Sequence, residues 1–127
     1  MLKARLIPSL LLKNKGLVKT IKFKNPKYVG DPINAVRIFN EKEVDELIFL
    51  DITASREKRK PNIELVSDIA SECFMPLCYG GGISDIDDIS KILSIGVEKV
   101  SINTLAIEAP EMIKKSAEVF GSQSIVV

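Results

Sequence analysis

Three glycines, Gly80 to Gly82, follow directly on a short apolar run in the segment Met75–Ile83. A backbone rich in glycine can turn sharply there and expose its N–H groups. A second apolar run, Val97–Thr104, ends in Asn103 and Thr104, whose side chains can donate hydrogen bonds. If both runs are parallel strands, these groups meet at one edge of the sheet and form a cradle for an anion. A tight turn without a ligand is the alternative, and the glycine run alone leaves the two equally open.

Asp51 is the sharpest candidate for acid–base chemistry, because it ends the continuous apolar run Leu47–Leu50. A carboxylate at that position either caps the following loop or transfers protons, and we favour the cap. The chain contains no histidine, which excludes imidazole chemistry and leaves Asp, Glu, Lys, Cys and Tyr as proton carriers. Cys78 lies inside a strand-like run and is better explained as a small core residue than as a nucleophile.

Basic residues gather in two places. Lys19 shares with Lys22 an alternating run that is typical of a half-exposed strand or hairpin arm, so a solvated face is the default and anion binding the alternative. The second place is the loop between Thr53 and Pro61. It carries Arg56, Lys58, Arg59 and Lys60. These four side chains either grip a phosphate or are simply solvated.

Three charged residues, Arg5, Glu46 and Lys99, each open an expected strand. In a barrel these N-terminal ends converge at the bottom, where the three charges would pair and plug or gate the floor. The alternative is three unrelated surface residues. Their equivalent placement in three repeats favours the ring.

The elements that carry these residues alternate strand and helix four times. We expect strands over 5–12, 47–50, 75–79, 100–103 and 124–127, and helices over 32–40, 63–73, 84–95 and 110–120. Asn25-Pro26 and Gly30–Pro32 are expected turns, with Asp31 and Asn62 as helix caps. This order predicts an α/β fold with a parallel sheet, either open and doubly wound or closed as a barrel. The glycine run lacks the dinucleotide spacing, so a nicotinamide cofactor is set aside.

Length and composition fit one globular domain of 127 residues with a formal net charge of +1. That charge gives no argument for binding nucleic acid or a membrane. Charges interrupt the first residues, so we expect no signal peptide, and the two cysteines fit a reduced, cytoplasmic location. We expect no cofactor and no metal.

Four segments taken together resemble the HisF family, the cyclase subunit of imidazole glycerol phosphate synthase. They are Phe49–Ser55, Gly80–Ile83, Lys99–Thr104 and Phe120–Gln123. The resemblance covers the whole chain and implies the N-terminal half of a (β/α)8 TIM barrel, a (β/α)4 half-barrel forming a single domain over 1–127. An open half-barrel has two unpaired edges, so we expect the isolated chain to self-associate.

The resemblance also implies an activity and a set of roles. In this family a glutaminase, HisH, docks at the barrel bottom, and its ammonia reaches a phosphorylated aminoimidazole nucleotide at the top. The products are imidazole glycerol phosphate and an aminoimidazole carboxamide ribonucleotide. Carried onto this chain, the catalytic or substrate-contacting residues are Asp51 and Lys19, and the ammonia gate is Arg5, Glu46 and Lys99. The implied phosphate and substrate contacts are Gly80, Gly81, Gly82, Ser101, Asn103 and Thr104.

Two departures from the family pattern open a second hypothesis. Leu11 occupies the position of the first catalytic aspartate, and the second lies just beyond Val127. Leu10–Leu12, followed by Val18–Tyr28, resembles HisF paralogues that accompany amidotransferases acting on sugars of bacterial surface polysaccharides and flagellin glycans. In those paralogues the barrel passes ammonia onward. The chain is therefore a cyclase subunit or a catalytically altered ammonia conduit, with an inert fragment as a third possibility.

Overall fold

The computed structural model describes residues 5–13, 16–21, 24–52, 54, 59–102 and 110–126, with the backbone alone for 18–21 and 24–29. Strands and helices alternate as the sequence predicts from β4 onward. The strands are β1 Ser9–Lys13, β2 Gly16–Ile21, β3 Lys24–Gly30, β4 Leu47–Asp51, β5 Leu77–Gly80, β6 Lys99–Ser101 and β7 Ile125–Val126. The helices are α1 Pro32–Lys42, α2 Ile63–Glu72, α3 Ile86–Ser94 and α5 Pro110–Phe120, with a 3-10 turn at Ser122–Ser124.

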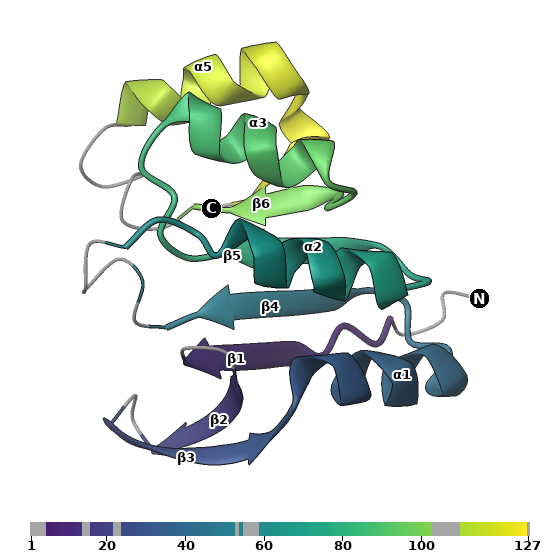
Figure 1. The fold of residues 1–127 in the computed structure, drawn as a ribbon. Coiled ribbons are helices and arrows are strands. Elements are labelled where there is room, and N and C mark those ends of the chain that lie inside the picture. The colour runs from purple at the N-terminus through teal and green to yellow at the C-terminus, as the bar shows by residue number, and fades with distance from the viewer. Residues whose placement is uncertain are drawn as a thin grey trace.

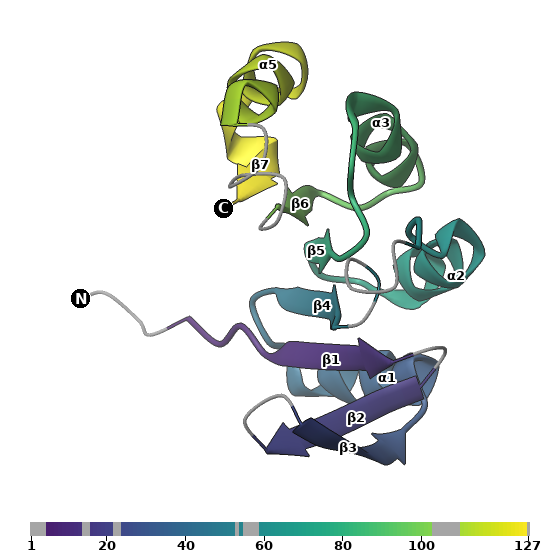
Figure 2. The ribbon, with the colours of Figure 1, turned by 90° about the vertical axis from the view of Figure 1, so that its left-hand side faces the viewer.

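The strands form one sheet in the order β3-β2-β1-β4-β5-β6-β7. Strands β1, β4, β5, β6 and β7 run parallel, whereas β2 and β3 form an antiparallel hairpin beside β1. Figure 1 shows the helices lying along the strands, and Figure 2 shows the sheet curving with the helices on its outer side. Within the described residues the sheet is open, with β3 and β7 as its edges. This confirms the α/β, barrel-type fold with parallel strands.

The predicted turn at Asn25-Pro26 is wrong, because both residues lie inside β3. A proline lacks the N–H that a central strand needs, but β3 is the edge of the sheet, where that donor is dispensable. The hairpin is irregular, with register shifts between Leu17 and Val18 and between Lys19 and Ile21. Such local irregularity is not encoded in an alternating pattern of residue types.

The first strand begins later than predicted, at Ser9. Its entry segment is nevertheless tied to the chain before β4. The N–H of Leu6 donates to the Asp45 carboxylate at 2.6 Å, and the N–H of Asp45 donates to the Leu6 carbonyl at 3.0 Å. The N–H of Ile48 then donates to the carbonyl of Pro8 at 3.0 Å, so the two segments are paired before β1 itself starts.

Both predicted helix caps are present. The Asp31 carboxylate accepts the N–H of Ile33 at 2.8 Å, and the Asn62 side chain accepts the N–H of Leu65 at 3.1 Å. These contacts satisfy N–H groups that the first turn of a helix leaves without intrahelical partners. None of the helices in the described ranges is long and apolar enough to cross a membrane.

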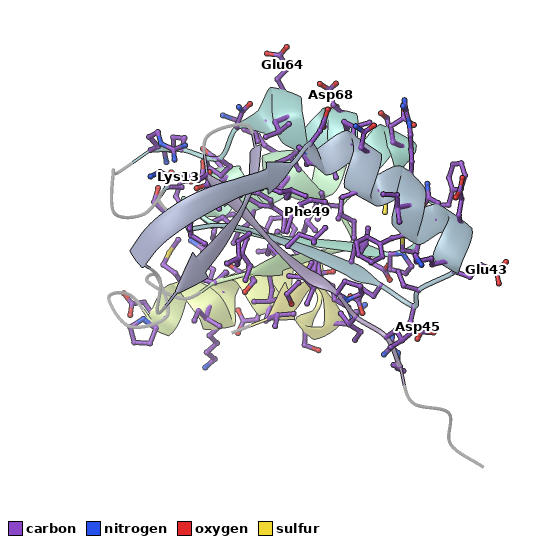
Figure 3. The ribbon with its side chains drawn as sticks, turned by 90° about the horizontal axis from the view of Figure 1, so that it is seen from below. Lys13, Glu43, Asp45, Phe49, Glu64 and Asp68 are labelled. Carbon is purple, nitrogen blue, oxygen red and sulfur yellow. The ribbon has the colours of Figure 1, made fainter. Side chains whose placement is uncertain are left out.

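Alternation along the strands divides the sheet into two faces. One face is covered by helices and is buried. Its residues include Leu12, Leu47, Phe49, Tyr79 and Val100, which pack in one core with Val36, Val66, Ile69, Ile89 and Ile92. Figure 3 shows Phe49 in the interior, whereas Glu64 and Asp68 project from the outer side of α2. We call this the helix-covered face.

The other face, which we call the open face, carries the intervening residues. The register aligns Leu11 with Leu50, Ile48 with Cys78, and Gly80 with Ser101. Leu11, Ile48 and Leu50 are only partly buried, in contrast to their neighbours Leu12 and Phe49. The open face is therefore the concave side of the curve in Figure 2.

Candidate functional site

Several predicted site residues lie together at the carboxyl-terminal end of the parallel strands. Gly80 ends β5, where it lies between Leu50 of β4 and Ser101 of β6. Asp51 ends β4 at the same end. In Figure 3, Lys13 marks this end of the strands and Asp45 marks the opposite end. Loops at the carboxyl ends of parallel strands are the usual place for ligands in such folds.

The glycine turn, Gly80 to Gly82, is shaped by both conformation and packing. Gly81 has φ +125° and Gly82 has φ +73°, values that other residues rarely adopt. A Cβ on Gly81 would lie 2.7 Å from the Cβ of Asp51, and one on Gly82 would lie 2.6 Å from the carbonyl oxygen of Arg59. The backbone conformation and the close packing are enough to require glycine at these positions, whether or not a ligand binds. Anion binding by the turn therefore stays a prediction.

Asp51 points toward the helix-covered face, and its side chain is 4% exposed. One carboxylate oxygen accepts the N–H of Ala54 at 3.1 Å, which is the loop-capping contact that the sequence favoured. The Arg59 guanidinium lies 3.4 and 3.5 Å from the two carboxylate oxygens. A catalytic role for Asp51 stays a prediction.

The basic loop is anchored by carboxylates. Besides the Arg59 contact with Asp51, the Lys60 ammonium lies 3.0 Å from Asp88 and 3.2 Å from Asp85. Hydrogen bonds to Asp88 and then Asp85 raise the pKa of Lys60. The N–H of Asp88, and more weakly Lys60, lower the pKa of Asp85. Arg56 and Lys58 lie outside the described residues.

Sequence reasoning missed Asp88, which is only 5% exposed. Its carboxylate accepts from the backbone N–H of Ser84 at 3.0 Å, the hydroxyl of Ser84 at 3.2 Å and Lys60 at 3.0 Å. The available signal was its place in the first turn of a helix, three residues after Asp85, whose carboxylate accepts the Asp88 N–H at 2.9 Å. Nothing in that signal points to Lys60.

At the opposite end of the sheet the structure brings Arg5, Glu46 and Lys99 together. The Glu46 carboxylate lies 3.4 Å from the Arg5 guanidinium and 3.3 Å from the Lys99 ammonium. Glu46 itself is 4% exposed, and its buried negative charge is paired with both cationic side chains. A role for this charged cluster as a gate stays a prediction.

Cys78 lies on the open face between this cluster and the glycine turn. Burial, and secondarily the negative charge of Glu46, raise the pKa of its thiol to about 11. The thiol is therefore protonated and uncharged near neutral pH, as expected of a core residue rather than a nucleophile.

A family model described as "Histidine biosynthesis protein" matches residues 5–127. The chain belongs to this histidine biosynthesis family. It is 64% identical over 126 residues to "Putative imidazole glycerol phosphate synthase subunit hisF2" of Pseudomonas aeruginosa, covering 99% of this chain and 50% of that protein. It is 59% identical over 127 residues to "Putative imidazole glycerol phosphate synthase subunit HisF" of Leptospira borgpetersenii, covering 100% of this chain and 50% of that protein.

A third relative is "Imidazole glycerol phosphate synthase subunit HisF" of Exiguobacterium, which is 48% identical over 127 residues, with 100% of this chain and 50% of that protein covered. The chain spans about half the length of the curated relatives that it matches. The resemblance to HisF is confirmed.

The structure describes the remaining predicted site residues to different extents. Leu11 lies in β1, aligned with Leu50 of β4 and Val18 of β2, and is partly buried on the open face. The backbone of Lys19 lies in β2 opposite Lys27, but its side chain lies outside what the structure describes. Asn103 and Thr104 lie outside the described residues.

Proposed function

We propose that this chain is part of a HisF-type subunit of a glutamine amidotransferase complex. In this function, ammonia from a HisH-type glutaminase is used to form imidazole glycerol phosphate and aminoimidazole carboxamide ribonucleotide. The names of the relatives support the class. One geometric observation carries it for this chain: the charged cluster around Glu46 and the glycine turn lie at opposite ends of the same open face.

In this proposal ammonia enters at the charged cluster, where Glu46 holds Arg5 and Lys99 across the N-terminal ends of the strands. The substrate is a phosphorylated small molecule. Its phosphate is bound at the carboxyl ends, where backbone N–H groups and short hydroxyl or amide side chains suit an anion. The proposed contacts are Gly80, Gly81, Gly82, Ser101, Asn103 and Thr104, with Lys19 and Asp51 nearby. The proposed location is the cytoplasm, where the two cysteines of the chain would stay reduced.

A second function, an ammonia conduit for a sugar amidotransferase of surface-polysaccharide or flagellin glycan synthesis, is favoured by Leu11. A leucine side chain transfers no proton, and it stands where the family has its first catalytic aspartate. Between Glu46 and Gly80, the described open-face residues of β1, β4 and β5 are Ser9, Leu11, Ile48, Leu50 and Cys78. This path is uncharged while the thiol is protonated, which suits passage of neutral ammonia.

One assay separates the two functions. The chain is joined to the second half of the Exiguobacterium relative, and the purified hybrid receives the aminoimidazole nucleotide and an ammonium salt. Formation of imidazole glycerol phosphate by the unaltered hybrid supports the cyclase. If the hybrid forms imidazole glycerol phosphate only after Leu11→Asp, the result supports the conduit function. It also shows that the rest of the cyclase pocket is competent. Absence of turnover in both overturns the cyclase, with Leu50→Asp as a control for a carboxylate at the neighbouring open-face position.

We also propose self-association of the chain when it is produced alone. Strands β3 and β7 are the edges of the described sheet, and unpaired edges offer backbone groups to another strand. Light scattering across a range of concentrations tests this, and a monomer at the highest concentration contradicts it.

A further inference from the structure

Arg59 and Lys60 are neighbours in sequence, yet their side chains are bound to carboxylates on two different elements. Arg59 contacts Asp51 at the end of β4. Lys60 contacts Asp88 in the first turn of α3, and also donates to the Ser84 hydroxyl at 2.6 Å. The segment from Arg59 to Pro61 therefore bridges the end of β4 and the start of α3.

The glycine turn lies directly against the backbone of this segment. A Cβ on Gly82 would meet the carbonyl oxygen of Arg59 at 2.6 Å and the nitrogen of Pro61 at 3.1 Å. The N–H of Arg59 donates to the Ala54 carbonyl at 2.8 Å, which fixes the segment on its other side. Gly82 is thus in contact with a backbone that is itself held at both ends.

The chain just after the glycine turn is held by the same network. The Asp88 carboxylate binds the backbone N–H and the hydroxyl of Ser84, two residues beyond Gly82. Because Lys60 binds the same carboxylate, the segment before α2 and the residue after the turn share one anchor. Mutual hydrogen bonding of this kind gives a single arrangement when every member has a partner.

We propose that Arg59 and Lys60 are positioning residues that hold the glycine turn in one conformation, with Asp51 and Asp88 as their anchors. This inference rests on the proposed function in one respect: the turn that they hold is the proposed phosphate site. Backbone N–H groups fixed before the ligand arrives bind it more tightly, because less conformational freedom is lost on binding. Arg59 and Lys60 act through their carboxylate partners, and neither contacts the phosphate.

The first test measures the backbone order of Gly81 and Gly82 by nitrogen-15 relaxation in the chain and its variants. We expect order parameters of about 0.85 in the unaltered chain and of about 0.6 in Lys60→Gln and in Asp88→Asn. Lys60→Arg should restore the order, because a guanidinium can still donate to Asp88. Lys60 and Lys91 both line a cavity of about 190 Å³. Lys91→Gln removes the same charge from that cavity and is therefore the matched control.

Lys60 suits this test because its side chain is 60% exposed, so its replacement leaves the core intact. Thermal unfolding of each variant checks that the fold is retained. Unchanged order at Gly81 and Gly82 in both Lys60→Gln and Asp88→Asn overturns the proposal. An equal loss of order in Lys91→Gln also overturns it, because the effect would then come from charge alone.

A titration with inorganic phosphate separates this inference from the proposed function. If the turn binds phosphate, we expect Lys60→Gln to weaken binding about tenfold and Lys60→Arg to restore it. If phosphate shifts no signal of the turn in the unaltered chain while the variants still lose order, the positioning role stands and the phosphate site is wrong. Equal affinity in the unaltered chain and Lys60→Gln overturns the positioning role.

Discussion

Leu11 and Asp51 lie on opposite faces of the sheet, although both are near the carboxyl ends of adjacent strands. Leu11 is aligned with Leu50 on the open face, whereas Asp51 is aligned with Leu12 on the helix-covered face. The position at which the resemblance to HisF predicts a catalytic aspartate therefore faces a different side from Asp51. A carboxylate restored at position 11 and the one at Asp51 would not form a directly coupled pair through the sheet.

This difference between faces predicts unequal effects of the same substitution at adjacent positions. Leu12→Asp should destabilise the chain by about 4 kcal/mol or more, because Leu12 is 1% exposed and a carboxylate there would be buried without a partner. Leu11→Asp should cost about 1–2 kcal/mol, since its side chain is only partly buried. Urea unfolding of both variants measures the difference. Equal destabilisation would contradict the assignment of the two faces.

Neutralising Glu46 should destabilise the charged cluster. In Glu46→Gln, Arg5 and Lys99 lose their shared partner, and we expect a loss of about 1–3 kcal/mol in the free energy of unfolding. The loss stays below that of a fully buried pair, because the Arg5 side chain is 62% exposed. Glu98→Gln, at an exposed neighbouring position, is the control and should lie within about 0.5 kcal/mol of the unaltered chain.

The glycine turn should tolerate no side chain at Gly82. Gly82→Ala combines φ +73° with a Cβ only 2.6 Å from the Arg59 carbonyl oxygen, so we expect a loss of about 2–3 kcal/mol. Gly30→Ala is the matched control, because a Cβ there meets no atom within 4 Å in the part of the chain that the structure describes, and φ is not positive. It should be neutral or slightly stabilising. Thermal unfolding of both variants gives the comparison, and an unchanged Gly82→Ala would show that the turn is adaptable.

The Cys78 thiol should react slowly in the folded chain. Its pKa of about 11 leaves about 0.1% thiolate at pH 8, against about 10% for an ordinary pKa of 9.0. In a Cys73→Ser background, iodoacetamide should therefore alkylate the folded chain about 100-fold more slowly than the chain unfolded in urea. Similar rates in the two states would show that the thiol is neither buried nor perturbed.

The same pKa sets the sign of a stability change. A folded-state pKa raised above the unfolded value means that the folded chain holds the proton more tightly. The contribution of Cys78 to stability is therefore complete below about pH 9 and is lost as the pH rises toward about 11. Cys78→Ala should show a smaller decline in the free energy of unfolding over this window. If the free energy of unfolding declines equally in Cys78→Ala and in the unaltered chain, the decline comes from groups other than Cys78.

Much of the fold could be predicted because its signals are local. The apolar run before Asp51, the caps Asp31 and Asn62, and the helix between Asp85 and Gly96 depend on residues close in sequence. The strand around Pro26 could not, because only the position of β3 at the sheet edge makes a proline acceptable there.

The site was predicted less completely, because its contacts depend on register and on loops that meet in space. The placement of Gly80 beside Ser101 follows from a parallel sheet, and Arg5, Glu46 and Lys99 follow from three equivalent strand starts. The partners of Arg59 and Lys60 follow from neither. A basic loop gives no indication of which carboxylates it will meet, and Asp88 is 28 residues away from Lys60 in sequence.

The two hydrogen bonds between Leu6 and Asp45 have a consequence for the cluster beside them. They fix the backbone on both sides of the contact, because Arg5 precedes Leu6 and Glu46 follows Asp45. The paired backbone therefore holds Arg5 and Glu46 close together. Their charged side chains have a high effective concentration with respect to each other. Formation of the ion pair then requires ordering of the side chains alone, because the backbone on both sides is already paired.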